Sequence, residues 1–252
     1  EELALFDKGI PRQGIEELKP TPAFALILTG IRRCGKSTLL RQLMLKLKGF
    51  YYFNFEDSRV SNFELSDFEK LDQIFKEDFK EQDHYFFDEI QNIPQWERFV
   101  RRLVDIKKQV IITGSNASLL SKELGTRLTG RHLDYELFPF SYKEFLAFTK
   151  MTNSLKSFDE YLLEGGFPEY LNSKKPNTLQ ELLTDVLARD IAMRYNIRNR
   201  KALKELAIYL LTNVGKPFTY NSLKKHFNLG SINSVISFIS YFDDLIDFIL
   251  PS

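Results

Sequence analysis

The sequence predicts an α/β fold: a parallel β-sheet covered by helices on both faces, followed by an all-helical part. Up to about residue 140, short apolar runs alternate with stretches of helical periodicity. Strand and helix in turn are typical of a parallel sheet whose two faces are both covered. Beyond that point the strand signals fade and helical patterns remain. Such sheets bind their ligands at the carboxyl ends of the strands, so we expect the functional site there.

Five apolar runs supply the expected strands, and four stretches between them supply the expected helices. The strands are predicted at residues 24–30, 50–55, 84–89, 109–114 and 132–138. The helices are predicted at residues 36–48, 66–80, 95–107 and 116–124. From this order we predict a first domain over residues 1–150.

The rest of the chain is predicted to be helical and to divide once more. Helical patterns cover residues 141–150, 157–164 and 176–195, and Gly-Gly-Phe-Pro at 165–168 breaks them. Residues 200–248 hold three amphipathic stretches with a glycine-containing turn before the third, as in helix-turn-helix or winged-helix units. We therefore predict a helical lid or linker over 151–198 and a winged-helix-like unit over 199–252.

The composition of the 252 residues is ordinary for a globular protein and argues against several classes. Apolar residues make up 43% and charged residues 27%, and the net charge of +1 gives no bulk attraction to nucleic acid or membranes. No apolar run approaches the roughly 18 residues of a membrane span. The single cysteine cannot form a disulfide within the chain. We expect a cytoplasmic protein, and the missing initiator Met leads us to expect a piece of a longer one.

Residues 30–37 read GIRRCGKS and fit the pattern G-x-x-x-x-G-K-[ST] at every fixed position. Glycines let the backbone curl so that N–H groups point at phosphate oxygens, and the following helix presents its positive amino end. Lys36 can place its ammonium on the β- and γ-phosphates, and the Ser37 hydroxyl can ligate Mg²⁺. The other candidate nucleotide contacts here are Gly30, Arg32, Arg33, Cys34, Gly35 and Thr38.

Cys34 lies inside this loop and has two interpretations. It can be a small side chain that the loop tolerates. Alternatively, it can be a thiol whose pKa is lowered near the amino end of a helix, which would make the nucleotide site sensitive to thiol reagents.

An acidic pair follows about 50 residues later, at the end of the apolar run HYFF. Asp88 is predicted to hold Mg²⁺ and Glu89 to polarise the hydrolytic water. An Asp-Glu pair alone is a weak signal, because such pairs often cap helices. Its position at the end of a buried strand after a phosphate loop makes it a strong one.

Further polar residues follow the fourth expected strand and precede the fifth. Thr113, Ser115 and Asn116 could sense the γ-phosphate, although Ser115 or Asn116 could equally cap the next helix. Arg127 or Arg131 could stabilise charge in the transition state, in its own subunit or in a neighbour's, or could be a surface arginine. We favour Arg131 because it directly abuts the strand. The three histidines are scattered without metal-ligand spacing.

These motifs together resemble the prokaryotic AAA-type ATP-binding proteins of the archaeal-ATPase-like group. The resemblance covers nearly the whole chain and rests on the stretches LTGIRRCGKSTLLRQL, YFFDEIQNIPQWERFVRRL, VIITGSNASLLS, LTGRHLDYELFPFSYKEF, EGGFPEYL and VLARDIAMRY. It implies an AAA-like P-loop core with strand order 5-1-4-3-2, a small helical region, a winged helix, and commonly a nuclease-like domain beyond. It also implies that Lys36 and Ser37 bind phosphate and metal, that Asp88 and Glu89 serve metal and water, and that Arg131 matches the family's arginine after LTG.

The expected third helix of the carboxyl-terminal unit, near residues 231–245, contains no Lys or Arg. Phosphate contacts dominate nucleic-acid affinity, so such a helix is a poor DNA reader. Lys224 and Lys225 are the nearby positive pair. We therefore favour a packing or protein-contact module over DNA binding.

The leading hypothesis is an ATPase that binds ATP or ADP with Mg²⁺ and changes conformation with the nucleotide state. A second is a nucleotide-gated binding or scaffold protein with little turnover, because an arginine required from a neighbour would leave a monomer inactive. A third, weaker one is a winged-helix DNA-binding regulator. The expected partners are the nucleotide and either further copies of the chain or another protein. Adenine is expected over guanine because no N-K-x-D reader is present, and the segment Ile10 to Arg12 is the candidate adenine pocket.

Overall fold

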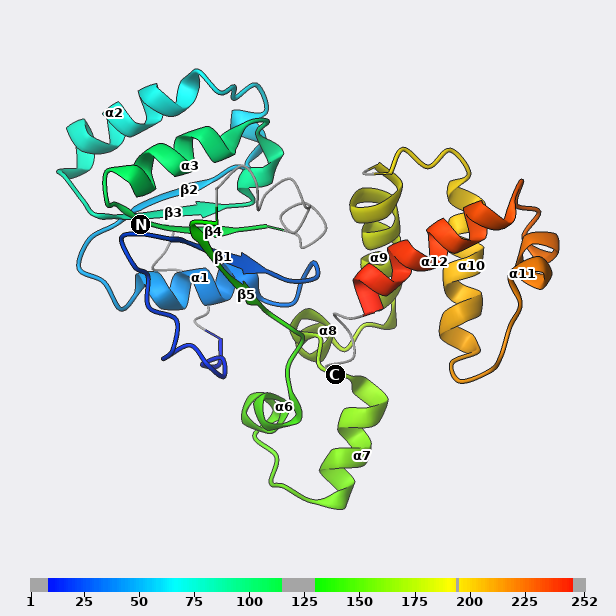
Figure 1. Ribbon diagram of the computed structural model, residues 1–252. Helices are drawn as coiled ribbons and strands as arrows, with labels where there is room; N and C mark the ends of the chain where they lie inside the picture. Colours follow the sequence, from blue (N-terminus) through cyan, green and yellow to red (C-terminus); the bar gives the residue numbers. More distant parts are fainter. Residues whose placement is uncertain (1–8, 115–129, 194, 247–252) are drawn as a thin grey trace. The chain divides into compact units, whose positions relative to one another are not determined.

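The computed structural model describes residues 9–114, 130–193 and 195–246 (Figure 1). It forms two compact units, Glu1–Leu171 and Asn172–Ser252, and each is treated by itself. The division into 1–150, 151–198 and 199–252 remains a prediction.

The first unit is built around a five-stranded parallel sheet. The strands are β1 (Ala25–Thr29), β2 (Tyr51–Asn54), β3 (His84–Asp88), β4 (Gln109–Thr113) and β5 (His132–Glu136). Their order is β2-β3-β4-β1-β5, and every neighbouring pair is parallel. This is the predicted order 5-1-4-3-2 read from the other edge, so the predicted fold class is confirmed.

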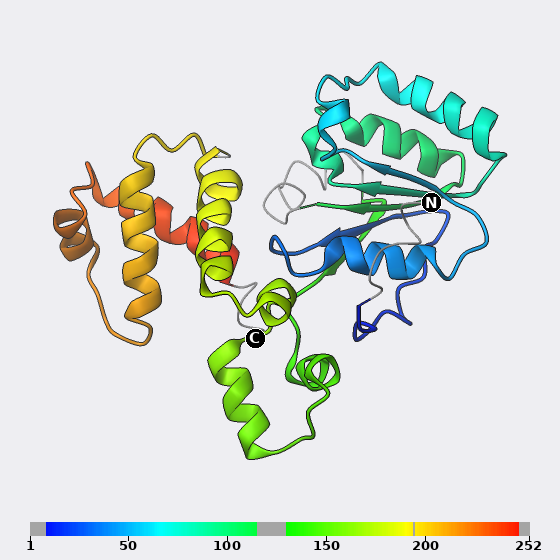
Figure 2. The same ribbon diagram turned by 180° about the vertical axis from the view of Figure 1, so that it is seen from behind.

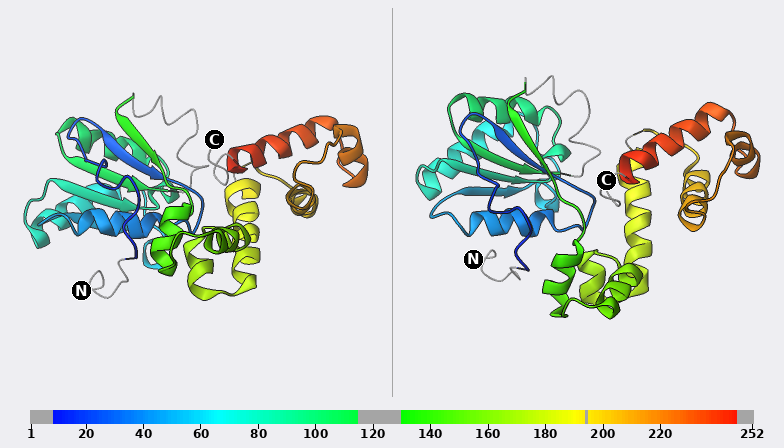
Figure 3. Two further views of the ribbon diagram at one scale, coloured as in Figure 1. Left: turned by 90° about the horizontal axis from the view of Figure 1, so that it is seen from below. Right: turned by 60° about the horizontal axis from the view of Figure 1, so that its bottom comes forward.

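Helices cover both faces of the sheet, as predicted. The covering helices are α1 (Lys36–Met44), α2 (Asp67–Phe79) and α3 (Trp96–Asp105), with short 3₁₀ turns at Ser58–Val60 and Ile90–Asn92. Helices α2 and α3 lie on one face and α1 on the other (Figures 1 and 3). The helix predicted at 116–124 lies outside the described residues.

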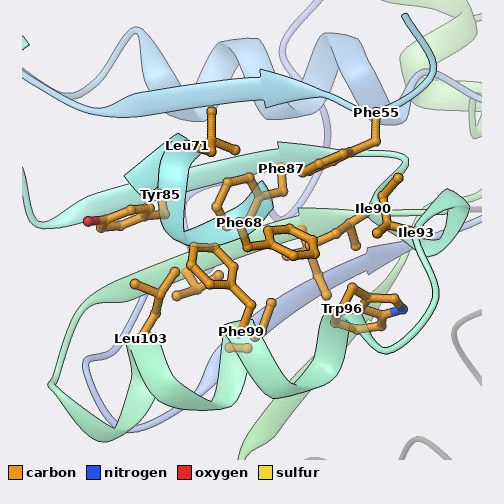
Figure 4. Packing of buried hydrophobic residues seen from close by; sticks show 14 of the residues in the cluster. Phe55, Phe68, Leu71, Tyr85, Phe87, Ile90, Ile93, Trp96, Phe99 and Leu103 are labelled. Atoms are coloured by element: carbon orange, nitrogen blue, oxygen red, sulfur yellow. The ribbon is translucent and has the colours of Figure 1, made fainter. Parts of the chain in front are cut away.

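An aromatic core fills the space between the sheet and helices α2 and α3 (Figure 4). Side chains alternate along a strand, so Tyr85 and Phe87 of β3 point into this core while Phe86 points to the opposite face. Phe68 of α2 stacks on Phe99 of α3, with ring centroids 4.6 Å apart. Burying both faces of the sheet fixes which residues face which helix layer.

After β5 the chain of the first unit continues in α6 (Tyr142–Thr149), α7 (Leu155–Glu164) and α8 (Pro168–Ser173), whose last two residues belong to the second unit. Helix α6 begins in a capping box, in which Ser141 and Glu144 each bond the other's backbone N–H. The glycine pair predicted as a break does separate α7 from α8. Pro168 then opens α8, because proline suits the first position of a helix.

The regular elements among the described residues of the second unit are all helices (Figure 2). Its helices are α9 (Pro176–Asp185), a π-helical segment η4 (Val186–Met193), α10 (Arg200–Thr212), α11 (Tyr220–His226) and α12 (Ile232–Ile246). They share an apolar core to which Leu206, Leu223 and Val235 contribute. The described residues of this unit include no strand that could form a wing, so the winged helix remains a prediction. Within the described residues, no helix is both long and apolar enough to cross a membrane.

Candidate nucleotide-binding site

The loop at residues 30–37 joins β1 to α1 at the carboxyl end of the sheet, and two of its positions accept only glycine. Gly30 has φ +145°, and a Cβ there would lie 2.2 Å from the backbone oxygen of Leu137. Gly35 has φ +106° and stands immediately before the first residue of α1. L-residues avoid this backbone region, so the two fixed glycines of the motif follow from sterics.

Lys36 opens α1 and turns its ammonium back over the loop. Its Nζ donates to the carbonyl oxygens of Gly30, at 3.0 Å, and Ile31, at 3.3 Å. The same nitrogen lies 4.0 Å from Oε1 of Glu89. The side chain is only 5% exposed, so its positive charge acts where solvent screens it little.

Asp88 ends β3 and is buried beside the loop. Its carboxylate accepts a hydrogen bond from the Thr113 hydroxyl, at the end of β4, and is also hydrogen-bonded to Ser37 of α1. Burial raises the pKa of Asp88, and the Glu89 charge adds to this, while the bonds from Thr113 and Ser37 oppose it. The structure therefore brings together the residues predicted for metal binding, Ser37 and Asp88.

Glu89 follows in a left-handed conformation with φ 53°, which turns the chain out of the strand. Its backbone N–H donates to Thr113 Oγ1 at 3.1 Å, and its carboxylate accepts a bond from Gln91 Nε2. Sequence reasoning missed Gln91. The available sequence signal was the position of Gln91, two residues beyond a predicted catalytic glutamate. The short 3₁₀ turn that follows Glu89 brings the two side chains together.

Tyr52 of β2 also belongs to this cluster and was missed from the sequence. Its hydroxyl is hydrogen-bonded to Arg41 of α1 and to Asp88. Burial and the neighbouring Asp88 charge raise the pKa of Tyr52 to about 12, so the phenol stays protonated and can donate to the carboxylate. A tyrosine on the strand next to the one bearing the acidic pair was the signal available.

The oxygen atoms of Ser37 and Asp88 fit Mg²⁺. This hard cation prefers oxygen ligands and is usually held by one or two carboxylates together with substrate phosphates. Among the described residues, no group of three or more His, Cys, Asp or Glu side chains could hold a metal ion. One hydroxyl and one carboxylate, those of Ser37 and Asp88, suit an ion that is shared with a bound phosphate.

The remaining loop residues have carboxylate or backbone neighbours. Arg33, with φ 64°, places Nη1 3.1 Å from Oε1 of Glu169 in α8, and Arg32 lies 3.7 Å from Glu56. The side chain of Thr38 faces Gly9, since a Cβ on that glycine would lie 3.1 Å from the threonine methyl. Whether these side chains contact nucleotide remains a prediction.

Cys34 is completely buried within the loop. Burial raises the pKa of its thiol, although the charges of Lys36 and Arg12 oppose this. The hypothesis of a thiol with lowered pKa is therefore wrong. Proximity to a helix amino end does not offset the loss of hydration that a thiolate would suffer. The small tolerated side chain fits the structure.

Arg131 is not brought to the loop of its own chain. It immediately precedes β5, and its carbonyl accepts from the N–H of Ala25, the first residue of β1. All parallel strands begin at the same end of the sheet. Arg131 therefore lies at the amino end of the strands, opposite the carboxyl end that carries the phosphate loop. Its guanidinium pairs with Asp105 at the end of α3. A role in a neighbouring subunit's site remains a prediction.

Three further predicted residues, Ser115, Asn116 and Arg127, lie outside the described residues, and the predicted adenine segment lies within them. The segment from Ile10 to Arg12 does lie beside the loop, because Arg12 Nη1 donates to the carbonyl of Cys34 at 2.8 Å. Its part in adenine binding remains a prediction.

A parallel sheet of this order, with a G-x-x-x-x-G-K-S loop after β1 and an acidic pair after β3, defines a P-loop domain of the AAA type. Comparison with known families agrees. Residues 23–146 match the family model described as "AAA domain", and residues 155–246 match one described as a domain of unknown function (DUF8612). Residues 23–146 are thus similar to AAA domains and have the AAA-like P-loop fold. The second match spans the boundary predicted at residue 199.

Curated relatives are longer than this chain. An uncharacterized protein of Methanocaldococcus jannaschii is 35% identical over 90% of the chain and 56% of its own length. An uncharacterized protein of Haemophilus influenzae is 32% identical over 77% of the chain and 52% of its own length. The chain thus spans about half the length of these two relatives.

Solved structures overlap with the chain only loosely. The ORC1 protein of Aeropyrum pernix in complex with DNA gives a TM-score of 0.39 at 14% identity, covering 91% of this chain and 79% of that one. Domain III of the Thermotoga maritima replication initiation protein DnaA gives a TM-score of 0.35 at 19% identity, covering 90% of this chain and 85% of that one. The fold assignment accordingly rests on the strand order, the loop and the family match.

Proposed function

We propose that the chain binds ATP with Mg²⁺ and hydrolyses it, and that the nucleotide state changes its conformation. The observation that carries this proposal is one connected cluster at the carboxyl end of the sheet. In it, the Lys36 ammonium lies over the phosphate loop, and the Asp88 carboxylate is bonded to Ser37 and Thr113. Glu89 lies within 4.0 Å of Lys36.

Each group has a defined part in this reaction. The loop amides and Lys36 hold and neutralise the phosphates, and Ser37 and Asp88 would hold Mg²⁺. The ion, when bound, neutralises charge on the phosphate oxygens. Glu89, which lies 4.0 Å from Lys36 and is oriented by Gln91, accepts a hydrogen bond from the attacking water.

The contact between Arg33 and Glu169 supports a coupling of nucleotide to conformation. Arg33 belongs to the phosphate loop, and Glu169 lies in α8, through which the chain enters the second unit. A bound phosphate would compete with Glu169 for the guanidinium, because both are anions that arginine binds with good geometry. Nucleotide binding would then alter the first turn of α8.

A second candidate is a nucleotide-gated binding protein with little turnover. It is favoured by the position of Arg131, whose guanidinium pairs with Asp105 at the opposite end of the sheet. A chain that needs this arginine from a neighbour would retain nucleotide and hydrolyse it slowly when alone. DNA binding has less support, because α12 contains no Lys or Arg.

Phosphate release by the wild type, Glu89→Gln and Lys36→Ala tests the proposal. We expect the wild type to release phosphate only with Mg²⁺. Glu89→Gln should keep ATP affinity but lose activity by about 10²–10⁴-fold, and Lys36→Ala should lose binding. Equal background release from wild type and Glu89→Gln, with ATP retained by both, would favour the gated binder. If the wild type binds no Mg·ATP in calorimetry, both candidates fail.

A further inference from the structure

Arg12 is a buried arginine that connects the phosphate loop to the chain beyond β5. It is 6% exposed, although it precedes the sheet in a segment without regular structure. Its Nη1 donates to the carbonyl of Cys34 at 2.8 Å, and its Nη2 donates to that of Phe138 at 2.6 Å. The guanidinium carbon also lies 5.0 Å from the centroid of the Phe140 ring.

The third side of the guanidinium is fixed by a carboxylate. Nε of Arg12 donates to Oε1 of Glu144 at 2.8 Å. Glu144 also accepts from the backbone N–H groups of Gln13 and Ser141, both at 2.9 Å. Each of the three guanidinium nitrogens therefore donates to a partner, and the side chain has little freedom to rotate.

This arrangement determines how one peptide unit of the loop is oriented. The Cys34–Gly35 peptide is trans and planar, so the carbonyl of Cys34 and the N–H of Gly35 point in opposite directions. Arg12 holds the carbonyl, and the N–H consequently points away from Arg12. Arg12, Glu144 and Phe138 fill the near side, so an anion cradled by the loop must lie on the far side, where this N–H points.

Gly35 shows how closely the two groups fit. A Cβ on Gly35 would lie 3.2 Å from Nη1 of Arg12, which is tighter than most real Cβ contacts. The loop therefore rests directly on the guanidinium. Since Lys36 and Ser37 follow Gly35 at once, a rotation of this peptide would displace the start of α1 as well.

We propose that Arg12 is a positioning residue of the nucleotide site: it orients the Cys34–Gly35 peptide so that the Gly35 N–H donates to a phosphate oxygen. This inference rests on the proposed nucleotide binding and adds a residue outside the loop motif to it. Arg12 touches no phosphate and acts through the loop. It contributes to phosphate affinity, whereas Glu144 contributes mainly to folding.

The test measures Mg·ATP and Mg·ADP affinity of the full chain by calorimetry for Arg12→Lys and Glu144→Gln. A lysine keeps the charge but lacks the planar fork that reaches Glu144, Cys34 and Phe138 together. We expect Arg12→Lys to bind about tenfold more weakly or worse, the loss typical of one charge-assisted hydrogen bond. Glu144→Gln keeps a side-chain oxygen that can accept from Arg12 Nε, so Arg12 should stay in place. Affinity should then remain within about threefold of the wild type, although the unfolding midpoint falls.

Two results would overturn the inference. One is an Arg12→Lys protein, folded by circular dichroism, that binds within twofold of the wild type. The other is an equal loss of affinity in Glu144→Gln, which would show that any loosening of this region suffices. Failure of the proposed function itself is distinguishable, because then the wild type would not bind Mg·ATP either. Arg101→Lys, at a half-exposed position on α3, is the matched control and should change nothing.

A measurement on the unmodified protein covers the case in which Arg12→Lys does not fold. Arginine labelled with ¹⁵N reports guanidinium N–H groups whose rotation and exchange are restricted. We expect Arg12 to give such a restricted signal both without nucleotide and after addition of Mg·ADP. Disappearance of that restricted signal on nucleotide binding would show that the Arg12 contact breaks, and it would sink the proposal.

Discussion

At the scale of single residues, Thr113 joins the two acidic residues of the site through one hydroxyl group. The hydroxyl donates to the carboxylate of Asp88 and accepts from the backbone N–H of Glu89. The threonine side chain is itself fully buried. Orientation by such outer partners decides how well a metal ligand performs, because it fixes the direction of the ligand's lone pairs.

Thr113→Val should impair both stability and turnover. It removes the hydroxyl at nearly constant volume, leaving a buried N–H and a buried carboxylate each short of one partner. We expect the free energy of unfolding to fall by about 1–3 kcal/mol and ATP turnover to fall about 10–100-fold. Urea titration and phosphate release measure the two effects. Thr113→Ser keeps the hydroxyl and should retain most turnover; equal activity in Val and Ser variants would contradict the assignment.

Glu144 predicts a dependence of stability on pH. Burial alone would raise its pKa, but the N–H groups of Gln13 and Ser141 and the charge of Arg12 outweigh burial and lower the pKa below its ordinary value near 4.5. A carboxyl whose folded pKa is lowered stabilises the fold above its unfolded pKa. That stabilisation is lost as the pH falls through the folded value.

The wild type should therefore exceed Glu144→Gln in unfolding free energy by a constant amount between pH 6 and 8, about 1–3 kcal/mol. The difference should shrink below about pH 4.5, because the wild-type carboxyl then takes up a proton on unfolding. Urea titrations at stepped pH values measure it. A difference that stays constant down to pH 3 would show that Glu144 is not stabilised in its ionised form.

At the scale of elements, Gly166 is the point where α7, α8 and the segment after β5 meet. Its carbonyl accepts from the N–H of Phe140 at 2.7 Å, and a Cβ on it would lie 2.2 Å from the Phe140 oxygen. The hydroxyl of Tyr161, in α7, donates to that same oxygen. The contact places the stretch PFSYKEF directly against the stretch GGFPEY.

Gly166→Ala should destabilise the first unit by about 1–3 kcal/mol or more, because the new methyl group would overlap a backbone oxygen that cannot rotate away. Thermal and urea unfolding of the full chain measure the loss. Gly230→Ala is the matched control, since a Cβ there meets nothing within 4 Å and the backbone is not left-handed. A Gly166→Ala protein as stable as Gly230→Ala would contradict the close packing.

Most elements of the first unit could be predicted because their sequence signals are physical requirements. A strand buried on both faces needs a continuous apolar run, and β1, β3 and β4 are buried along nearly their whole length. The runs predicted for the less buried β2 and β5 also form strands of the sheet. The end of α1 could not be read. The pattern continues to 48, but Lys46 and Leu47 bond to carbonyls three residues back and tighten into turns before Gly49. The π-helical register of 186–193 was also hidden, because side-chain patterns do not report which carbonyl an N–H reaches.

The site was predictable where a motif combined position with chemistry, and less so where tertiary contacts decide. Lys36, Ser37 and Asp88 come together because the carboxyl ends of parallel strands all lie at the same end of the sheet. The same rule places Arg131 at the opposite end, since it precedes its strand, although its motif favoured it as a catalytic residue. Arg12 and Tyr52 carry no motif, and their role follows only from what the folded chain places beside them.

At the scale of the whole molecule, the position of Arg131 makes a prediction about assembly. A residue at the amino end of the strands, opposite the phosphate loop, can serve a nucleotide only in another copy of the chain. Cyclic assemblies with head-to-tail contacts bring opposite ends of neighbouring copies together. We therefore expect the protein to have a mass above that of the monomer in the presence of Mg·ATP. We also expect the Arg131→Ala variant to lose turnover while keeping its affinity for ATP.

Mixing two inactive variants tests this expectation directly. In a mixture of Arg131→Ala and Glu89→Gln, a site works when its own chain keeps Glu89 and its neighbour keeps Arg131. In an equal mixture with random exchange, about one half of the chains keep Glu89 and about one half of their neighbours keep Arg131. Both conditions therefore hold for about one quarter of the sites in a closed ring. Phosphate release should therefore rise to about a quarter of the wild-type rate after subunit exchange. Arg101→Ala, which lies near the same Asp105 and is equally exposed, is the control and should be active by itself. A mixture no more active than the mean of its two components would show that Arg131 serves no neighbouring site, and its ion pair with Asp105 would then be its whole role.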